Sequence, residues 1–351
     1  MSNLNSLLFY ILSFSLIFII TLIFDNIKNK GKMIKGIYFF AIFMVMYFIS
    51  GYRYNVGWDY KAYIDMYSSY NYLDKGSVLL FSISNLISNE PQTIIKLYSL
   101  LTITFFILFL NKRIEKEKIS YIIGSFLFVV FPMSFNGIRQ YLAITIILYA
   151  VELMKEKKTK VGLLFYILAV FMHNSAIIFV PYLFILLKGK KNCAKKIYIL
   201  TLLVSIGLIL FTSVLGRISV MRKYLGYMEM LSLSNTNYNL IISYVPFISL
   251  LALFYKTIKK DENIKIYTSL FLSGIFLEIV FSSTEVSRIG LYLSAYLILL
   301  FPKLLEKIKK FNTRIAVKCL YYTLLVIYFV LVFYIVGRAK VFPYNNILFL
   351  S

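Results

Sequence analysis

Long apolar runs separated by short lysine-rich stretches are the feature that most restricts the fold of this chain. The runs are about 15 to 20 residues long, close to the ~20 apolar residues that a helix needs to cross a bilayer. Charged residues make up 15% of the sequence, against about 25% in soluble domains. These features exclude a soluble globular enzyme and a disordered chain. With only 2 Cys, a disulfide-stapled secreted domain is excluded as well.

The net charge is explained by membrane topology. The chain has 38 Lys+Arg and 15 Asp+Glu, a formal charge of +23, which in a soluble protein would suggest a nucleic-acid partner. Here the basic residues stand in clusters between the apolar runs, the pattern that holds Lys and Arg on the cytoplasmic side of a membrane. We therefore expect a lipid bilayer around the chain and no nucleic acid.

The sequence predicts an all-α polytopic membrane protein with about twelve hydrophobic segments. They lie at 6–24, 36–51, 93–110, 119–135, 140–154, 161–172, 175–187, 197–214, 240–255, 266–282, 289–302 and 319–336. Segments 161–172 and 175–187 are short and are flanked on both sides by lysine clusters. A hairpin or re-entrant pair keeps both clusters inside, whereas one tilted helix would put one cluster outside.

An amino terminus on the outer side places alternate connections inside and both termini outside. The inner connections are 25–35, 111–118, 155–160, 188–196, 256–265 and 303–318, and they hold 27 of the 38 Lys+Arg. We expect one membrane-embedded domain over 1–351, with outer loops at 52–92 and 215–239. The stretch 77–88 is amphipathic and suits a helix on the membrane surface. The first segment does not resemble a cleavable signal peptide.

Cysteine and histidine are too few for a zinc site. Cys193 and Cys319 lie beside basic clusters assigned to the cytoplasm, where thiols stay reduced. His173 is the single histidine, and there is no CxxC or HExxH motif. We expect no disulfide, metal or cofactor.

Three arginines fall on the predicted outer side, against the general trend. Arg53 follows the second segment, Arg139 begins the fifth with Gln140 beside it, and Arg288 begins the eleventh. Snorkelling to the interface is one interpretation. Guanidinium groups also bind phosphate oxygens in a bidentate manner. The other interpretation is therefore that these arginines bind a lipid diphosphate.

The same outer side collects candidates for a general base. His173 stands between apolar residues, and its pKa range suits a base at neutral pH. It could equally be a structural, hydrogen-bonded histidine. Asp59, which follows Gly57 and Trp58, is the rival base or one half of a solvated ion pair, and Glu285 is a third candidate.

Aromatic side chains repeat at helical spacing next to these residues. Tyr60, Tyr63, Tyr67 and Tyr70 would share one helical face beside Trp58. They would form either an interfacial aromatic belt or a platform on which sugar rings stack. No glycine-rich phosphate loop accompanies them, so a nucleotide-bound sugar donor is not expected.

Three ordered blocks resemble the EpsG family of Wzy-type polysaccharide polymerases. They are RYNVGWDYKAYIDMY at 53–67, NGIRQYLAITIILYAV at 136–151 and FMHNSAIIFVPY at 171–182. They resemble the family's R-x-x-x-G-x-D-Y block, R-Q-x-x-A helix start and H-x-S-A turn, and the turn with Arg288 also fits.

The resemblance implies a membrane glycosyltransferase that joins oligosaccharide repeat units on the outer face of the bacterial cytoplasmic membrane. Donor and acceptor would be linked to undecaprenyl diphosphate, and the product would be a capsule, O-antigen or exopolysaccharide. A chain-length regulator and a flippase of the same pathway would be partners. His173, Asp59 and Glu285 would be catalytic, whereas Arg53, Arg139, Gln140, Arg288, Trp58, Tyr60 and Tyr63 would bind substrate.

Two other functions remain open from the residues. A transporter of the same lipid-linked oligosaccharide would place ionisable groups near the membrane midplane and would often show related halves. A membrane O-acyltransferase would use His173 as its base and would need an acyl-donor site on the inner face.

Overall fold

The computed structural model describes residues 1–70, 73–188, 192–215, 238–282, 285–308 and 311–349. Helices dominate this part of the chain, and no β-strand forms in it. The chain divides into two compact units, the first formed by residues 1–176 and 319–351 and the second by residues 177–318. The predicted outer loop at 215–239 lies almost entirely outside the described residues.

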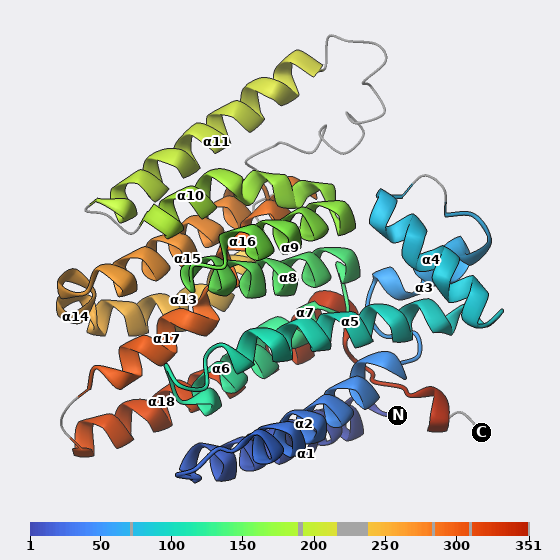
Figure 1. The fold of residues 1–351 in the computed structure, drawn as a ribbon, viewed down its shortest axis with the longest axis horizontal. Coiled ribbons are helices and arrows are strands. Elements are labelled where there is room, and N and C mark those ends of the chain that lie inside the picture. The colour runs from blue at the N-terminus through green and yellow to red at the C-terminus, as the bar shows by residue number, and fades with distance from the viewer. Residues whose placement is uncertain (71–72, 189–191, 216–237, 283–284, 309–310, 350–351) are drawn as a thin grey trace. The chain divides into compact units, whose positions relative to one another are not determined.

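The first unit contains the helices of the amino-terminal half and the end of the last long helix (Figure 1). Its helices are α1 (Asn3–Asn26), α2 (Lys32–Gly51), α3 (Asp59–Asp65), α4 (Lys75–Ile87), α5 (Gln92–Asn111), α6 (Ile119–Ser125), α7 (Phe131–Met133), α8 (Ile138–Lys155), α9 (Thr159–Met172) and the end of α18 (Phe311–Phe329). A π-helical turn, Phe126–Val130, joins α6 to α7, and another, Val330–Ile335, extends α18.

The second unit is also helical. Its helices are α10 (Val180–Lys188), α11 (Cys193–Leu215), α13 (Tyr238–Leu253), α14 (Tyr255–Lys260), α15 (Glu262–Val280), α16 (Leu291–Ser294), α17 (Leu297–Glu306) and the beginning of α18. The 3₁₀ turn η6 (Glu285–Gly290) precedes α16. It packs tightly on α15, because a Cβ added to Gly274 would meet the backbone of Gly290 and Ser294.

Every one of the twelve predicted hydrophobic segments falls on helix. Seven helical stretches in the described residues are long and apolar enough to cross a membrane, namely Asn3–Asn26, Lys32–Gly51, Gln92–Asn111, Cys193–Leu210, Glu262–Val280, Val286–Glu306 and Asn312–Ile335. Five further apolar helices are shorter, with 10–17 residues. The all-helical membrane class is thus confirmed, while the number of crossings and the side of each terminus stay predictions.

The predicted break between segments 161–172 and 175–187 is present. The α9 helix ends at Met172, and His173 adopts extended backbone dihedrals (φ −153°, ψ 109°) before the 3₁₀ turn Asn174–Phe179 begins. The amphipathic stretch 77–88 is also helical, as α4. It buries Leu80 and Phe81 and exposes Leu86 and Ile87.

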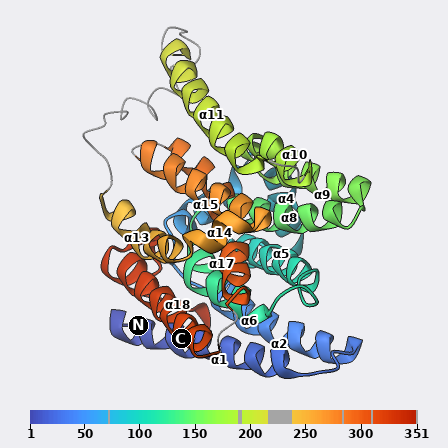
Figure 2. The same ribbon diagram turned by 90° about the vertical axis from the view of Figure 1, so that its left-hand side faces the viewer.

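The first unit is built around α8. This helix packs between α5 and α9, while α5 packs on α2 and α2 on α1. Gly162 allows the close approach of α9, since an added Cβ would overlap Met154 and the carbonyl of Ala150 on α8. Figure 2 shows α1 and α2 side by side at one edge of this unit. There α1 buries Tyr10 and Phe14 and exposes a leucine-rich face, as expected for a helix that contacts lipid tails.

The ends of these helices gather in two opposite places. At one end, which we call the lysine end, Lys35 pairs with Glu115 at 3.0 Å and Lys112 with Glu156 at 2.7 Å. These pairs join the lysine-rich connections 25–35, 111–118 and 155–160.

The opposite end, which we call the loop end, contains the described parts 52–70 and 73–74 of one connection, the connections 134–137 and 173–174, and the segment 337–347. The amino terminus lies here in Figure 1, and the Met1 amino group donates to Asn345 Oδ1 at 2.7 Å. The antiparallel course of the helices therefore separates the lysine-rich connections from the loops that carry the predicted site residues.

Candidate functional site

A guanidinium, an imidazole and a carboxylate from distant segments meet at the loop end of the first unit. The Asp74 carboxylate accepts a hydrogen bond from Arg139 Nη1 at 2.9 Å, and the same oxygen lies 3.1 Å from His173 Nδ1. The side chains of Arg139, His173 and Asp74 are 28%, 23% and 13% exposed. A ligand can therefore reach the cluster, yet the cluster is shielded enough for its charges to interact strongly.

Local structure positions each member of this cluster. Arg139 lies in the first turn of α8, whose N-cap, Gly137, adopts φ +73°. Asp74 is the N-cap residue of α4, and His173 ends α9. The start of α4 sits on the end of α9, since a Cβ on Gly76 would overlap the carbonyl of Phe171.

Asp74 was missed by the sequence analysis. Its one local signal is an aspartate directly before an amphipathic helix, which is common for an N-cap residue and gives no indication of a site. Burial of the carboxyl favours its neutral form, but the hydrogen bond from His173 and the charge of Arg139 outweigh burial. The pKa of Asp74 therefore lies below its usual value, and at neutral pH Asp74 is a carboxylate that favours an Nδ1–H on His173.

Asp59 supports the start of α8. Its Oδ2 accepts a hydrogen bond from the backbone N–H of Gly137 at 2.8 Å. The backbone of Gly57 also lies close to the carbonyl group of Phe135, since an added Cβ would overlap the carbonyl oxygen. Gly57 adopts φ +94° at this point. The segment 57–59 thus holds the turn from which Arg139 projects.

Arg53 is not one of the exposed groups of the Arg139–Asp74–His173 cluster. It is buried, with 1% of its surface exposed. Its Nε donates to Val56 O at 3.2 Å, and Nη1 donates to Ser50 O and to Ser99 Oγ. These bonds close the turn that follows α2. In this conformation Arg53 orders the loop, and it would reach substrate only after a rearrangement. Gln140 is likewise buried, within α8.

The tyrosines form neither an open platform nor a surface belt. Tyr60 is buried and donates to Gln92 Oε1 at 2.6 Å. Tyr63 is buried between the rings of Phe81 and Tyr98. A ring that stacks on a sugar must expose a face, so in this conformation Tyr60 and Tyr63 pack inside the unit, and their contact with sugar stays a prediction. Trp58 is 63% exposed, and Lys340 Nζ lies 5.5 Å from the centre of its ring.

The second unit contains Glu285 and Arg288, both in η6. The side chain of Glu285 lies outside the described residues. In the same unit Glu278 is buried in α15 and accepts hydrogen bonds from Tyr244 Oη at 2.9 Å and Ser294 Oγ at 2.7 Å. These bonds satisfy a carboxyl group at a depth where an isolated one would be costly.

No group of three or more His, Cys, Asp and Glu side chains within the described ranges could hold a metal ion. What the loop end offers is a guanidinium, an imidazole and a carboxylate in hydrogen-bonding contact. Such a set can bind an anionic group and remove a proton from a neighbouring hydroxyl.

Comparison with known proteins gives a match to one family model. Neither a curated protein nor a solved structure matches the chain. The EpsG family model matches residues 36–346, a range that contains all three members of the cluster, the whole second unit and most of the first. The chain therefore belongs to the EpsG family, the family of Wzy-type polysaccharide polymerases.

Proposed function

We propose that the protein is a polysaccharide polymerase that joins undecaprenyl-diphosphate-linked oligosaccharide repeat units on the outer face of the bacterial cytoplasmic membrane. Membership of the EpsG family supports polymerase activity. The contact of Arg139 and His173 through Asp74 carries the assignment to these residues. It joins a phosphate-binding group to a proton acceptor, which transfer from a diphosphate-linked sugar requires.

The outer face is proposed from the distribution of charge. The lysine-rich connections gather at one end of the first unit, and the Arg139–Asp74–His173 cluster lies at the other. Lys and Arg are enriched in cytoplasmic loops, so the lysine end would face the cytoplasm. The loop end would then meet lipid-linked repeat units on the outer side, where both chain termini would also lie.

The reaction assigns one role to each side chain. Asp74 holds the Nδ1–H of His173, which leaves Nε2 free to accept a proton from the acceptor hydroxyl. The hydroxyl oxygen attacks the anomeric carbon, and the bond from that carbon to the diphosphate oxygen breaks. Its electron pair goes to the leaving diphosphate, whose charge Arg139 stabilises. The product carries the new glycosidic bond, and undecaprenyl diphosphate is released.

The remaining site residues have supporting roles. Asp59 would keep Arg139 in place through the N–H of Gly137, and it is the alternative base. Trp58 is the exposed ring that could contact sugar. In the second unit, Glu285 would be a further candidate for the catalytic base and Arg288 would bind substrate, as the family resemblance implies.

The test is polymer formation by purified protein in detergent. The protein is incubated with a lipid-linked repeat unit, and the products are separated on a gel, where a ladder is expected. A flippase would give no ladder, because no membrane is present for it to act across. Arg139→Lys keeps the charge but loses the planar fork and should reduce the ladder strongly, whereas Lys61→Gln on the exposed face of α3 should not.

The identity of the base is decided by two further variants. His173→Gln should fold and bind substrate yet form almost no polymer, because an amide cannot accept the proton. If His173→Gln polymerises normally while folded Asp59→Asn does not, the base is Asp59 and the role given to His173 is wrong.

A further inference from the structure

A buried glutamine at the start of α5 holds the loop that follows α2. Gln92 is 7% exposed, and its Nε2 donates to the carbonyl oxygens of Gly51 at 2.9 Å and Arg53 at 3.1 Å. Its Oε1 accepts from Tyr60 Oη at 2.6 Å. Both donors and the acceptor of the amide are thus used. Because the partners come from both ends of the stretch 51–60, this one side chain fixes that stretch to α5.

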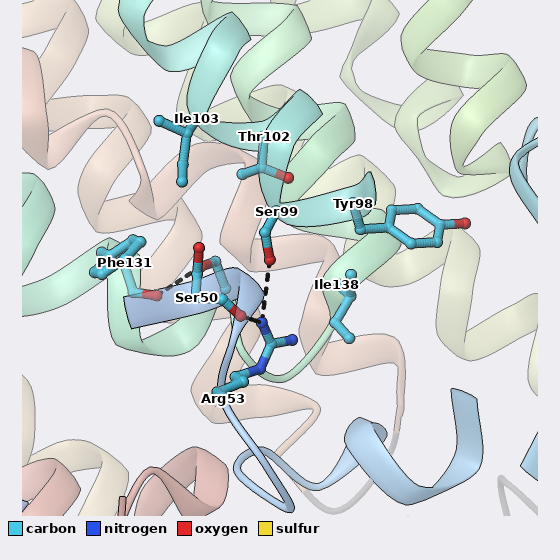
Figure 3. A pocket seen from close by; sticks show the side chains of 9 residues that line it. Ser50, Arg53, Tyr98, Ser99, Thr102, Ile103, Phe131 and Ile138 are labelled. Atoms are coloured by element: carbon cyan, nitrogen blue, oxygen red, sulfur yellow. Dashed lines mark hydrogen bonds between the residues drawn. The ribbon is translucent and has the colours of Figure 1, made fainter. Parts of the chain in front are cut away.

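A second side chain joins the same stretch to α5 (Figure 3). Arg53 Nη1 donates to Ser99 Oγ of α5 at 3.2 Å and also to the carbonyl oxygen of Ser50. Positions 92 and 99 share one face of α5, because their spacing is close to two helical turns of about 3.6 residues each. The loop is therefore attached to α5 at two points.

The stretch held in this way ends at the group that supports Arg139. Asp59 precedes Tyr60, and its Oδ2 accepts the backbone N–H of Gly137 at 2.8 Å. Gly137 is the N-cap residue of α8, and Arg139 lies in the first turn of that helix. A continuous series of contacts therefore leads from Gln92 through Tyr60 and Asp59 to the start of α8.

Small displacements of Arg139 would have large effects on the proposed reaction. A guanidinium stabilises a leaving diphosphate where its charge develops, and a misplacement of about 1 Å can lower a rate by about 10²-fold. Neutral hydrogen bonds, in contrast, contribute modestly to stability. Removal of the bonds of Gln92 should therefore leave a folded protein in which the start of α8 is displaced.

We propose that Gln92 is a positioning residue for the polymerase reaction, which sets the place of Arg139 by holding the stretch 51–60. The inference rests on the proposed function, in which Arg139 stabilises the leaving diphosphate. Gln92 is buried and acts through Tyr60 and Asp59, so it is not a catalytic residue.

The first measurement follows Trp58, which lies within the stretch and is the only tryptophan of the chain. Gln92→Met keeps the approximate shape of the side chain but removes all three hydrogen bonds. In the purified full chain without substrate, this variant should lower the fluorescence anisotropy of Trp58, because the stretch that carries the ring is attached less firmly to α5.

The second measurement separates kcat from KM in polymer formation. Gln92→Met should lower kcat by about 10- to 10²-fold with little change in KM. The reason is that the charge on the diphosphate grows as the bond to the sugar breaks, so a displaced Arg139 affects the transition state most.

Tyr60→Phe is the second variant, and it removes only the bond next to Asp59. It should lower both the anisotropy of Trp58 and kcat, in the same direction as Gln92→Met. If Tyr60→Phe instead raises KM and leaves the anisotropy unchanged, the Tyr60 hydroxyl contacts substrate and the proposed series of contacts is wrong.

Glu152→Gln is the matched control for a loss of stability. It removes a buried carboxylate at the lysine end, where Glu152 pairs with Arg113 and Lys116. This variant should keep the wild-type kcat and anisotropy of Trp58. A Gln92→Met variant that behaves in the same way, with a lower Tm but a wild-type kcat, would overturn the proposal.

Failure of the proposed function has a different signature. A wild-type protein that forms no ladder would overturn the polymerase assignment and, with it, the role of Gln92 in the reaction. A wild-type protein that forms a ladder, together with a folded Gln92→Met variant of wild-type kcat and anisotropy, would overturn the role of Gln92 alone.

Discussion

Replacing Asp74 by Asn tests whether the carboxylate acts through His173. The amide can still accept a hydrogen bond from Nδ1–H but cannot stabilise the imidazolium that forms when His173 takes a proton. The hydrogen bond that loses its charge joins His173 Nδ1 to Asp74 Oδ2 at 3.1 Å, and the Asp74 side chain is 13% exposed. Hydrogen bonds to charged groups are typically worth about 1.5–3 kcal/mol. At about 1.4 kcal/mol per factor of ten, polymerisation should fall by roughly 10- to 150-fold.

The assay is the initial rate of polymer formation by purified variants. His173→Ala should lower this rate more, by roughly 10²–10⁴-fold. Adding Asp74→Asn to His173→Ala should lower the rate little further, because the carboxylate then has no imidazole to stabilise. Asp65→Asn, an exposed carboxylate in α3, is the control and should be fully active. Wild-type turnover by Asp74→Asn, or a double variant whose loss is the product of the single losses, would refute the reasoning.

Three further outcomes follow from the fold. In cells expressing a variant without native cysteines, an impermeant thiol reagent should label Asn136→Cys but not Lys157→Cys; the reverse would invert the topology. Gly57→Ala places a Cβ at φ +94° against a carbonyl and should lower the free energy of unfolding by about 1–3 kcal/mol, whereas Gly36→Ala, with open space around it, should not. Glu152→Gln removes the buried carboxylate that pairs with Arg113 and Lys116, while Glu117 still pairs with Arg113, and should cost about 1.5–3 kcal/mol; a loss no larger than that of exposed Glu90→Gln in chemical unfolding would contradict this.

Hydropathy and charge predicted the helices because each segment must satisfy its own backbone in lipid. The distribution of charge located the break at His173, since lysines on both sides of 161–187 disfavour a single crossing. It also placed Arg139 and His173 at the same end of their helices, and the structure brings them to one carboxylate.

The remaining features depend on contacts that no local pattern encodes. Asp74 joins the cluster only because α4 packs on the end of α9. Charged residues are rarely buried, so the sequence suggested an accessible Arg53, yet its Nε and Nη1 donate to carbonyl oxygens of its own turn. Helical spacing put Tyr60 and Tyr63 on one face, but it could not show that α4 and α5 cover that face.

The pairing of the 52–57 turn with the segment 340–347 has a consequence for biosynthesis. Tyr54 N–H donates to Asn345 O, Gly57 N–H to Lys340 O, and Ile347 N–H to Tyr52 O. These partners leave the ribosome only after α18 has been made, long after α8 and α9. Until then the backbone groups of the turn lack these partners, and we expect the loop end to close as one of the last steps of assembly. A ribosome stalled before residue 340 would hold a nascent chain whose loop end is still open to proteases.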